Sequence, residues 1–418
     1  MMAARKPRIL FIAEAVTLAH VARPAVLAGT LAPHDYDVHF AAAERFSFCA
    51  PGGDVKRWPL TSMSTDAFLK NIAAGRPLFD IRTLGLYIDD DLRVLAHVQP
   101  DLVIGDLRLS LAVSCRVFGV PYAAIINATW SPFAVNPTYP IPEFKWTHLT
   151  GVRLAQKIFD CIRPFTFREL ARPLRYWQQR YGLRNTKSWL QAFTEADFLL
   201  YADTPELVPT ALAPASHSYI GPIIWSPPVA LPKWWNDLPA ERPAIYITLG
   251  SSGQLDYVPR LVEALAGAPY SVLLASAGRG TPRALPTNFY SADYFPGEEV
   301  ARRASVVVCN GGSATAYQAL SVGTPVIGLA SNMDQLLTME AIRRTGAGVH
   351  LRPESASARS IRELVDAMVQ SRGWTENARR VSTWFTRYRV ADTFPAFVDK
   401  ALAATGTAPA RRGWPVTS

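Results

Sequence analysis

Two short apolar runs joined through a pair of glycines constrain the fold of this chain more than any other feature. Residues 305–309 (SVVVC) are mostly β-branched and apolar, which predicts a buried strand. Asn310-Gly311-Gly312-Ser313 interrupts the run, a helical pattern covers residues 314–320, and residues 325–329 form a second strand-like run. The order predicts a strand–loop–helix–strand unit with Ser313 as the N-cap of its helix.

The start of this helix is a candidate anion site. The first amides of a helix have no partner within the helix, and the helix dipole adds partial positive charge, so a phosphate is the typical ligand. Glycines at 311 and 312 let the backbone turn sharply and let a ligand approach closely. Asp334 and Gln335 follow the second strand, where open α/β sheets place ligand-binding groups. The alternative, that the glycines serve only the turn, stays open because short glycine motifs occur by chance.

These residues in this order resemble the nucleotide-sugar signature of family-1 (UDP-glycosyltransferase-like) enzymes of the bacterial natural-product type: Gly-Gly-Ser-x-Thr, a helix, Gly-x-Pro-Val, then Asp-Gln. The resemblance implies an α/β chain with the GT-B fold, in which two Rossmann-like β/α/β domains face each other across a cleft and a C-terminal helix crosses back to the first domain. Three positions depart from the family pattern. Asn310 replaces the usual His, Gln318 replaces an acidic residue that holds the donor ribose, and Ala330 replaces a frequent Pro. Asn310 and Gln318 still form hydrogen bonds but are neutral, which leaves the nucleotide open between UDP and dTDP.

The resemblance also implies the donor, a nucleoside-diphosphate sugar. The small-residue loop at 250–253 suits a diphosphate through its serine hydroxyls and amides. Phe295 falls where the family stacks the nucleotide base on an aromatic ring. The expected donor-binding residues are Ser251, Ser252, Phe295, Asn310, Gly311, Gly312, Ser313, Ala314, Thr315, Gln318, Asp334 and Gln335.

The N-terminal half supplies candidates for the chemistry. Residues 8–13 predict a buried strand, and His20 follows it at the start of a helical segment. Residues 100–106 predict another strand, which ends in Asp106. In the resembled family a His at the first position deprotonates the acceptor hydroxyl, and an Asp at the second orients it, so the resemblance implies these catalytic roles for His20 and Asp106. A structural His20, and Asp106 as the cap of a helix over residues 108–118, are the alternatives.

A loop rich in proline and aromatic residues covers residues 128–146. Loops of this length in a compact domain are usually functional or disordered, and aromatic residues argue against disorder. We therefore expect an acceptor pocket with apolar walls that includes Trp130, Phe133, Tyr139 and Phe144. A packed surface loop is the alternative.

Composition limits the function classes further. The chain has 418 residues, of which 49% are hydrophobic, and no apolar run is long enough to predict a transmembrane helix. The short N-terminal apolar run contains Glu14 and leads into a strand, so we expect no signal peptide and a cytoplasmic protein. The four separated cysteines predict thiols, and Asp89-Asp90-Asp91 predicts a solvated helix face rather than a metal site. The net charge of +9 without a dense Lys/Arg tract argues against nucleic acid and is compatible with an anionic donor or a membrane surface.

The expected domains are 1–222 for the acceptor and 244–390 for the donor, with a proline-rich linker at 223–243, a crossing-back helix at 391–405 and a disordered tail at 406–418. The expected activity is metal-independent, inverting transfer of a sugar to a hydroxyl of a small, largely apolar or aromatic natural product, with no cofactor. Transfer to a lipid at the membrane surface is a rival activity, because residues 151–180 are helical and basic. A GT-B sugar epimerase also stays open, as does a catalytically idle GT-B protein that binds nucleotide and assists a partner. The sequence does not predict the oligomeric state.

Overall fold

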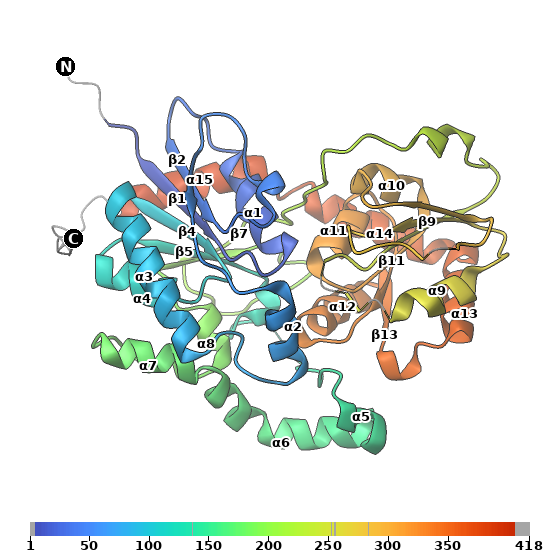
Figure 1. Ribbon diagram of the computed structural model, residues 1–418, viewed down its shortest axis with the longest axis horizontal. Helices are drawn as coiled ribbons and strands as arrows, with labels where there is room; N and C mark the ends of the chain where they lie inside the picture. Colours follow the sequence, from blue (N-terminus) through green and yellow to red (C-terminus); the bar gives the residue numbers. More distant parts are fainter. Residues whose placement is uncertain (1–4, 136, 252, 255, 283, 406–418) are drawn as a thin grey trace. The chain divides into compact units, whose positions relative to one another are not determined.

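The computed structural model describes residues 5–135, 137–251, 253–254, 256–282 and 284–405 (Figure 1). They fall into two compact units. The first takes the described residues within 1–136, 159–223 and 388–418, and the second those within 137–158 and 224–387. Each unit is built on its own parallel sheet.

The first unit contains a seven-stranded parallel sheet in the order β3-β2-β1-β4-β5-β6-β7. Its strands are β1 (Arg8–Ala13), β2 (Asp37–Ala42), β3 (Lys56–Pro59), β4 (Leu102–Asp106), β5 (Tyr122–Ile126), β6 (Phe198–Tyr201) and β7 (His217–Tyr219). The order reverses between β1 and β4, where Ala13 lies opposite Asp106. In doubly wound sheets such a switch point opens a crevice at the carboxyl ends of the strands, and ligands bind there.

Helices connect these strands. They are α1 (Leu18–Ala28), α2 (Thr65–Ala73), α3 (Ile81–Val98), α4 (Leu111–Phe118), α7 (Arg172–Arg180), α8 (Trp189–Phe193) and α15 (Val390–Thr405), with short 3-10 turns η1 (Ser47–Cys49) and η2 (Ala128–Trp130). Helix α6 (Val152–Leu170) belongs to both units, because its residues up to 158 fall in the second unit and the rest in the first. The C-terminal helix α15 belongs to this unit: Phe394 lies 5.9 Å from Phe11 of β1, between ring centroids, and Thr393 donates to the carbonyl of Ile220. The return of the chain to the first sheet is therefore as predicted.

The second unit contains a six-stranded parallel sheet in the order β10-β9-β8-β11-β12-β13. Its strands are β8 (Ala244–Thr248), β9 (Ser271–Ala275), β10 (Phe289–Ala292), β11 (Ala304–Cys309), β12 (Val326–Leu329) and β13 (Gly348–Leu351). Its helical segments are α5 (Lys145–Thr150), η3 (Lys233–Asp237), α9 (Tyr257–Leu265), α10 (Gly297–Arg303), α11 (Ser313–Ser321), α12 (Met333–Thr345), η4 (Pro353–Ser355), α13 (Ala358–Gln370) and α14 (Arg372–Phe385). The switch point lies between β8 and β11, so the two sheets share one topology.

Several sequence expectations change in the structure. Residues 137–158 make their contacts with the second unit, whereas the predicted boundaries put them in the first domain. Helix α4 begins at Leu111 with Ser110 at its N-cap, so Asp106 does not cap it. Asp90 and Asp91 are buried rather than solvated, because polar groups of neighbouring segments pair with them. The predicted tail at 406–418 lies outside the described residues.

Among the described residues, no group of three or more His, Cys, Asp or Glu side chains is placed to hold a metal ion. Within the same residues, every helix is too short or too polar to cross a membrane.

Candidate active site

The switch point of the first sheet brings His20 and Asp106 together, as the sequence predicted. Helix α1 starts directly after the loop that leaves β1, and His20 lies in its first turn. Asp106 ends the neighbouring strand β4. The Nδ1 atom of His20 lies 2.8 Å from Oδ1 of Asp106, which is hydrogen-bonding distance. The other ring nitrogen, Nε2, is the one a substrate hydroxyl would meet.

Arg23 joins this pair, and the sequence analysis missed it. One turn after His20 on α1, its Nε donates to Oδ2 of Asp106 at 2.7 Å and its Nη2 to Oδ1 at 2.6 Å. Its Nη1 donates to Oδ1 of Asn127 at 3.0 Å, and Asn127 donates in turn to Asp203. Residues three apart share a helix face, so the spacing of His20 and Arg23 was the available signal.

The environment of Asp106 decides its protonation state. The side chain is fully buried, and burial alone would raise its pKa. The charges of Arg23 and His20 and their hydrogen bonds act in the opposite direction and hold the pKa of Asp106 below its ordinary value. Asp106 is therefore ionised at neutral pH and can orient the His20 ring by accepting a hydrogen bond from the Nδ1–H of His20.

A second buried charge cluster lies at the same edge of the sheet. Arg108, with a fully buried side chain, donates to Oε2 of Glu14 at 2.8 Å and to Oδ1 of Asp91 at 3.0 Å, and its Cζ lies 3.7 Å from the centroid of the Tyr87 ring. Burial raises the pKa of both carboxyl groups, although Arg108 opposes the shift. Glu14 also accepts hydrogen bonds from Ser62 and Tyr87, and Arg108 donates to the carbonyl of Thr61. The cluster thus fixes the loop after β3 beside the candidate catalytic pair.

The switch point of the second sheet brings two predicted donor loops side by side. Thr248 at the end of β8 lies opposite Cys309 at the end of β11, so the segments that follow them leave the sheet together. Asn310, which is 6% exposed, accepts the amide of Gly312 at 3.2 Å through Oδ1. Ser251 lies in the neighbouring loop, and Ser252 lies outside the described residues. This is the edge at which nucleotides bind in doubly wound sheets.

Helix α11 begins at Ser313, and its N-cap is Gly312 rather than Ser313. A glycine with extended dihedral angles can serve as an N-cap without a side-chain bond. Ser313, Ala314 and Thr315 therefore form the first turn, whose amides lack partners within the helix. The geometry matches the predicted anion site, and the ligand stays a prediction.

Gly311 is the one glycine of this loop that both backbone and packing require. Its φ is +79°, a conformation that residues with a Cβ rarely adopt. A Cβ at this position would also lie 2.8 Å from Cγ of Met339 on α12. Gly312 has an ordinary φ of −72°, and the nearest atom to a Cβ there is 3.5 Å away. The two glycines therefore have separate roles.

Arg279 is a further cation at this edge that the sequence analysis missed. It follows β9 and donates through Nη1 to the carbonyls of Gly250 and Gly253. These contacts hold the loop after β8 and place a positive charge beside it. Nothing in the Gly-Arg-Gly sequence signals this role, because the contact depends on neighbouring strands that lie far apart in the chain.

Gln318 is more enclosed than the ribose-binding prediction implies. It is 7% exposed, and its Nε2 donates to the carbonyl of Trp225 and to Oγ of Ser226, both at 2.8 Å. Its Oε1 packs against Gly297, where a Cβ would lie 2.1 Å away. The amide nitrogen of Gln318 thus ties α11 to the segment before η3, and only Oε1 is left to accept from a ligand.

Of the remaining donor candidates, Asp334 and Gln335 lie at the start of α12, whereas Phe295 lies in the core. Asp334 lies in the first turn of α12, next to the buried Gln335. Gln335 accepts the amide of Ser331 at 3.0 Å, and Asn332 accepts the amide of Gln335, so both side chains cap this helix. Phe295 needs correction: it is 1% exposed, with the rings of Trp234 and Tyr246 edge-on to it, so it presents no face on which a base could stack.

The four aromatic residues predicted for the acceptor fall in different units. Trp130 and Phe133, in the first unit, pack on Phe193 and His217, with ring centroids 4.9 Å and 5.4 Å apart. In the second unit, Tyr139 is buried and Phe144 stacks on Trp146 at 6.3 Å. Their role toward an acceptor stays a prediction.

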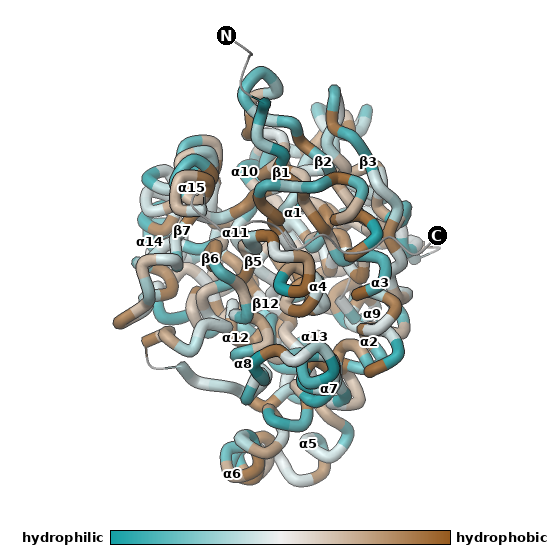
Figure 2. Tube along the Cα trace, turned by 90° about the vertical axis from the view of Figure 1, so that its left-hand side faces the viewer, coloured by the Kyte–Doolittle hydropathy of each residue, from teal (hydrophilic) through white to brown (hydrophobic). Residues whose placement is uncertain are grey.

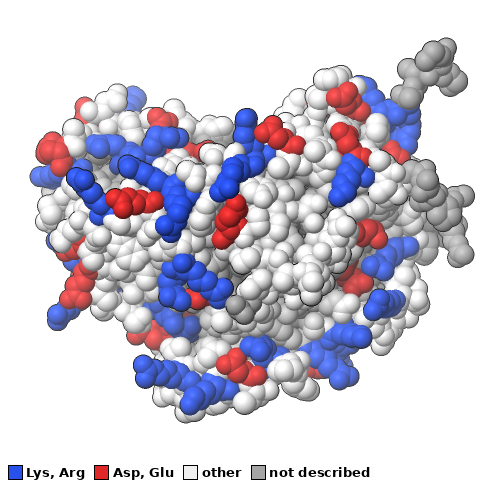
Figure 3. Space-filling model, turned by 180° about the vertical axis from the view of Figure 1, so that it is seen from behind, with Lys and Arg blue, Asp and Glu red and all other residues white. Residues whose placement is uncertain are grey.

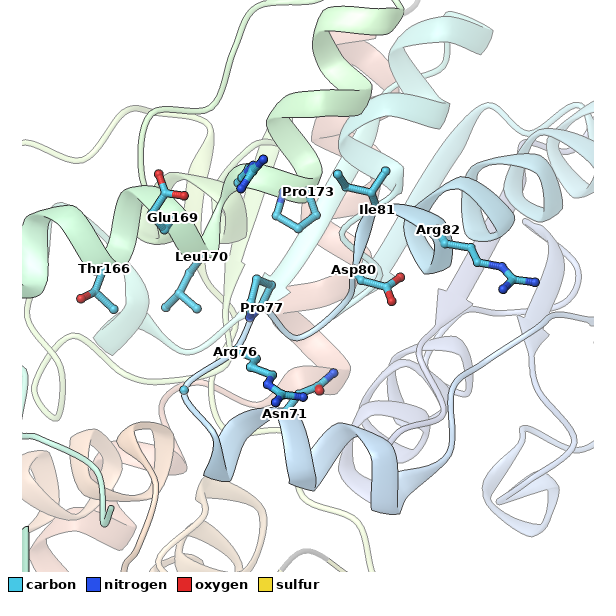
Figure 4. Close-up of a pocket in the computed structure, with 12 residues that line it drawn as sticks. Asn71, Arg76, Pro77, Asp80, Ile81, Arg82, Thr166, Glu169, Leu170 and Pro173 are labelled. Atoms are coloured by element: carbon cyan, nitrogen blue, oxygen red, sulfur yellow. The ribbon is translucent and has the colours of Figure 1, made fainter. Parts of the chain in front are cut away.

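The first unit also contains a cavity of about 730 Å³ (Figure 4). Its walls come from the α2–α3 segment and the α6–α7 segment, and none of the four aromatic residues lines it. Asn71, Asp80 and Arg76 face Glu169, Leu170 and Pro173 across it in Figure 4. A pocket of this size is large enough for a small molecule.

Known proteins match the chain along nearly its whole length. Residues 262–403 match the family described as "Erythromycin biosynthesis protein CIII-like, C-terminal domain". A "PGL/p-HBAD biosynthesis rhamnosyltransferase" of Mycobacterium bovis (strain BCG / Pasteur 1173P2) is 45% identical over 403 residues, which cover 96% of this chain and 89% of the relative. The chain is a family-1 glycosyltransferase. The identity over both units makes this glycosyltransferase an enzyme of the predicted family, not merely a protein of similar topology.

This glycosyltransferase resembles solved glycosyltransferase structures in fold. Spinosyn forosaminyltransferase SpnP superposes with a TM-score of 0.69 at 17% identity, covering 96% of this chain and all of that chain (100%). The glycosyltransferase VinC, solved in complex with dTDP, superposes with a TM-score of 0.65 at 17% identity, covering 94% of this chain and 99% of that chain. At such low identity the likeness concerns the fold, and it confirms the predicted GT-B architecture.

Proposed function

We propose that this glycosyltransferase transfers a 6-deoxyhexose such as rhamnose from a dTDP-linked donor to a hydroxyl of a largely apolar acceptor, with inversion at the anomeric carbon. The observation that carries the proposal is the ordered His20–Asp106 pair, because an idle nucleotide-binding protein has no use for a base held by a buried carboxylate. The sugar is suggested by the rhamnosyltransferase that is 45% identical.

The proposed transfer needs one base and one site for the leaving diphosphate. The acceptor oxygen attacks the anomeric carbon as its proton passes to Nε2 of His20, and Asp106 stabilises the resulting imidazolium. The bond between the anomeric carbon and the diphosphate oxygen breaks on the opposite face, which inverts the configuration. Asn310, the first amides of α11 and the α11 dipole stabilise the negative charge of the leaving diphosphate. Groups of this kind can take the part that a metal ion plays in other transferases.

The preference for dTDP rests on Gln318. An acidic residue in this place grips a ribose hydroxyl in the resembled family, and Gln318 is neutral. Its amide nitrogen is already bonded to Trp225 and Ser226. A deoxyribose lacks the 2′-hydroxyl, so it needs no hydrogen-bond acceptor for that group at this position, whereas a ribose does.

Thermal denaturation with a nucleotide panel tests the donor. A ligand present at about 100 times its Kd stabilises the fold by about 2.7 kcal/mol. We expect dTDP to raise the melting temperature more than UDP or GDP at equal concentration. A larger shift with UDP would refute the nucleotide assignment, and no shift with any of them would refute the proposed donor site.

The base is tested separately with dTDP-rhamnose and a phenolic acceptor. His20→Ala should lower kcat by about 10²–10⁴-fold, the usual contribution of a general base, while the dTDP-induced melting shift survives. NMR of the product should show the anomer opposite to that of the donor. Near-wild-type turnover of His20→Ala would remove His20 from the mechanism, and retained configuration would exclude single displacement.

A further inference from the structure

Helix α6 carries an exposed apolar stripe that the transfer reaction does not use. Leu154, Ile158, Ile162 and Phe165 are 53%, 41%, 46% and 70% exposed. They recur at helical spacing, so they lie along one face of α6. We call these four residues the α6 stripe. Single exposed apolar residues are ordinary, but a continuous row of large ones marks an interaction surface.

The stripe is a second apolar face, not a core face that failed to pack. Ala155, Phe159 and Phe167 of the same helix are buried, with 0%, 5% and 6% exposure, and the rings of Phe159 and Phe167 meet at 6.4 Å. Phe167 lies on the side of α6 opposite the stripe, Ala155 and Phe159 lie nearer to it, and the three residues attach the helix to the fold. The stripe therefore faces outward on a helix that is already anchored.

Cationic side chains lie along one side of the stripe. Arg153, Lys157 and Arg168 are exposed and lie beside it on the helix. Figure 2 shows hydrophobic and hydrophilic segments alternating around α6, and in Figure 3 Lys and Arg side chains outnumber Asp and Glu along the lower edge, where α6 lies. An apolar face with a basic border is the pattern of helices that lie in the plane of a membrane interface.

The surface next to the C-terminal end of the stripe carries charges of both signs, with cations in excess. Thr166, one residue past Phe165, lines the cavity of Figure 4, and so do the exposed Arg76, Arg82 and Arg172. Asp80 and Glu169 line the same cavity, so its arginines outnumber its carboxylates by three to two. Such a border favours an anionic surface and opposes a second copy of the chain, whose like charges would meet it.

We propose that the α6 stripe docks this glycosyltransferase on an anionic phospholipid membrane. Leu154, Ile158, Ile162 and Phe165 enter the boundary between headgroups and acyl chains, while the flanking cations lie at the lipid phosphates. Docking would bring the enzyme to apolar acceptors that partition into lipid. The inference concerns a surface and does not depend on the base, the sugar or the nucleotide proposed above.

Vesicle flotation tests the proposal with phosphatidylcholine alone and with phosphatidylcholine mixed with phosphatidylglycerol. We expect the enzyme to float with the anionic vesicles only and to dissociate as salt is raised. Ile158→Ser/Phe165→Ser should weaken binding about tenfold or more, since each side chain loses its apolar burial. Lys157→Gln/Arg168→Gln should weaken it about fivefold for each charge removed. Leu86→Ser/Leu212→Ser, at exposed apolar positions outside α6, is the matched control and should bind like wild type.

A spectroscopic measurement does not rely on substitution of the stripe. Cys161 is exposed on α6, whereas Cys49, Cys115 and Cys309 are buried, so a thiol-reactive, polarity-sensitive dye will label Cys161 selectively. We expect its emission to shift to the blue with anionic vesicles. Wild-type enzyme that stays with the buffer fraction, or a stripe variant that floats as well as the control, would overturn the proposal. So would self-association in gel filtration that the stripe variant abolishes, because the occupant would then be a second copy.

The stripe variants also separate this inference from the proposed reaction. Their dTDP-induced melting shift and their turnover of a water-soluble acceptor should equal those of wild type. Normal turnover with lost flotation supports docking, and normal flotation with failed turnover overturns only the proposed reaction.

Discussion

Replacing Arg23 by Met probes the charge balance that holds the candidate catalytic pair. Methionine keeps much of the length of the side chain but removes both hydrogen bonds to Asp106. Asp106 is fully buried, and the Arg23 side chain is 10% exposed, so the ion pair is almost completely shielded from solvent. Removal of one partner from a buried ion pair costs about 3–5 kcal/mol. We expect the lower part of this range, about 3 kcal/mol at neutral pH, because His20 still contacts Asp106.

The pH dependence of this loss has a definite sign. In wild type the pKa of Asp106 is lowered, so its ionised form stabilises the fold above the ordinary value of about 3.9, and that stability is lost as pH falls through the lowered pKa. In Arg23→Met the effect of burial prevails, the pKa of Asp106 rises, and protonation relieves the penalty as pH falls. The stability difference between wild type and variant should therefore shrink on acidification.

Urea denaturation of wild type, Arg23→Met, Asp106→Asn and the double variant measures these quantities. We expect the double variant to be more stable than Arg23→Met, because a neutral amide no longer leaves a buried charge without its partner. A loss below about 1 kcal/mol in Arg23→Met, the value for an exposed pair, would refute the reasoning. So would a double variant that is no more stable than Arg23→Met.

Four further substitutions test other parts of the structure. Gly311→Ala should lower the free energy of unfolding by about 1–3 kcal/mol and abolish the dTDP-induced melting shift. Gly312→Ala should fold normally. Equal stability of the two variants would contradict the packing argument. Arg108→Met should destabilise the first unit by about 3–5 kcal/mol at neutral pH, because it leaves buried carboxylates without their partner. The loss should be smaller in acid, since burial raises the pKa of these carboxyl groups and protonation removes the unpaired charge. Urea midpoints at the two pH values measure the difference. Gln318→Glu should raise the ratio of UDP-sugar to dTDP-sugar turnover, and an unchanged ratio in paired rate assays would show that this position does not select the nucleotide.

The sequence was sufficient to predict the architecture and the location of both candidate sites. Apolar runs that end in Asp106 and at Asn310 predicted strands at whose carboxyl ends ligands bind, and these strands border the two switch points. The His20–Asp106 contact was predictable because the resembled family carries both residues at these strand ends. Local patterning also predicted the start of α11 to within one residue.

Contacts between distant segments were not predictable in the same way. Asp89-Asp90-Asp91 has the pattern of a polar helix face, but Asp91 meets Arg108 in the core, because the charge of a partner from another segment compensates its burial. Phe295 occupies a sequence position typical of base stacking, yet it packs under Trp234 and Tyr246. Arg23, Arg279 and the linker bonds of Gln318 share this origin, since each depends on neighbours that only the folded sheets bring near.

The sequence by itself determined the order of strands and helices, the family, and the residues at each strand end, because these follow from periodicity and from short motifs along the chain. The tertiary structure alone decided which charges are buried in pairs and which apolar residues of α6 stay exposed. Hydrophobic periodicity cannot distinguish the packed face of α6 from its outward stripe, since both consist of large apolar residues at helical spacing. Only the neighbours that cover one face and leave the other uncovered make that distinction.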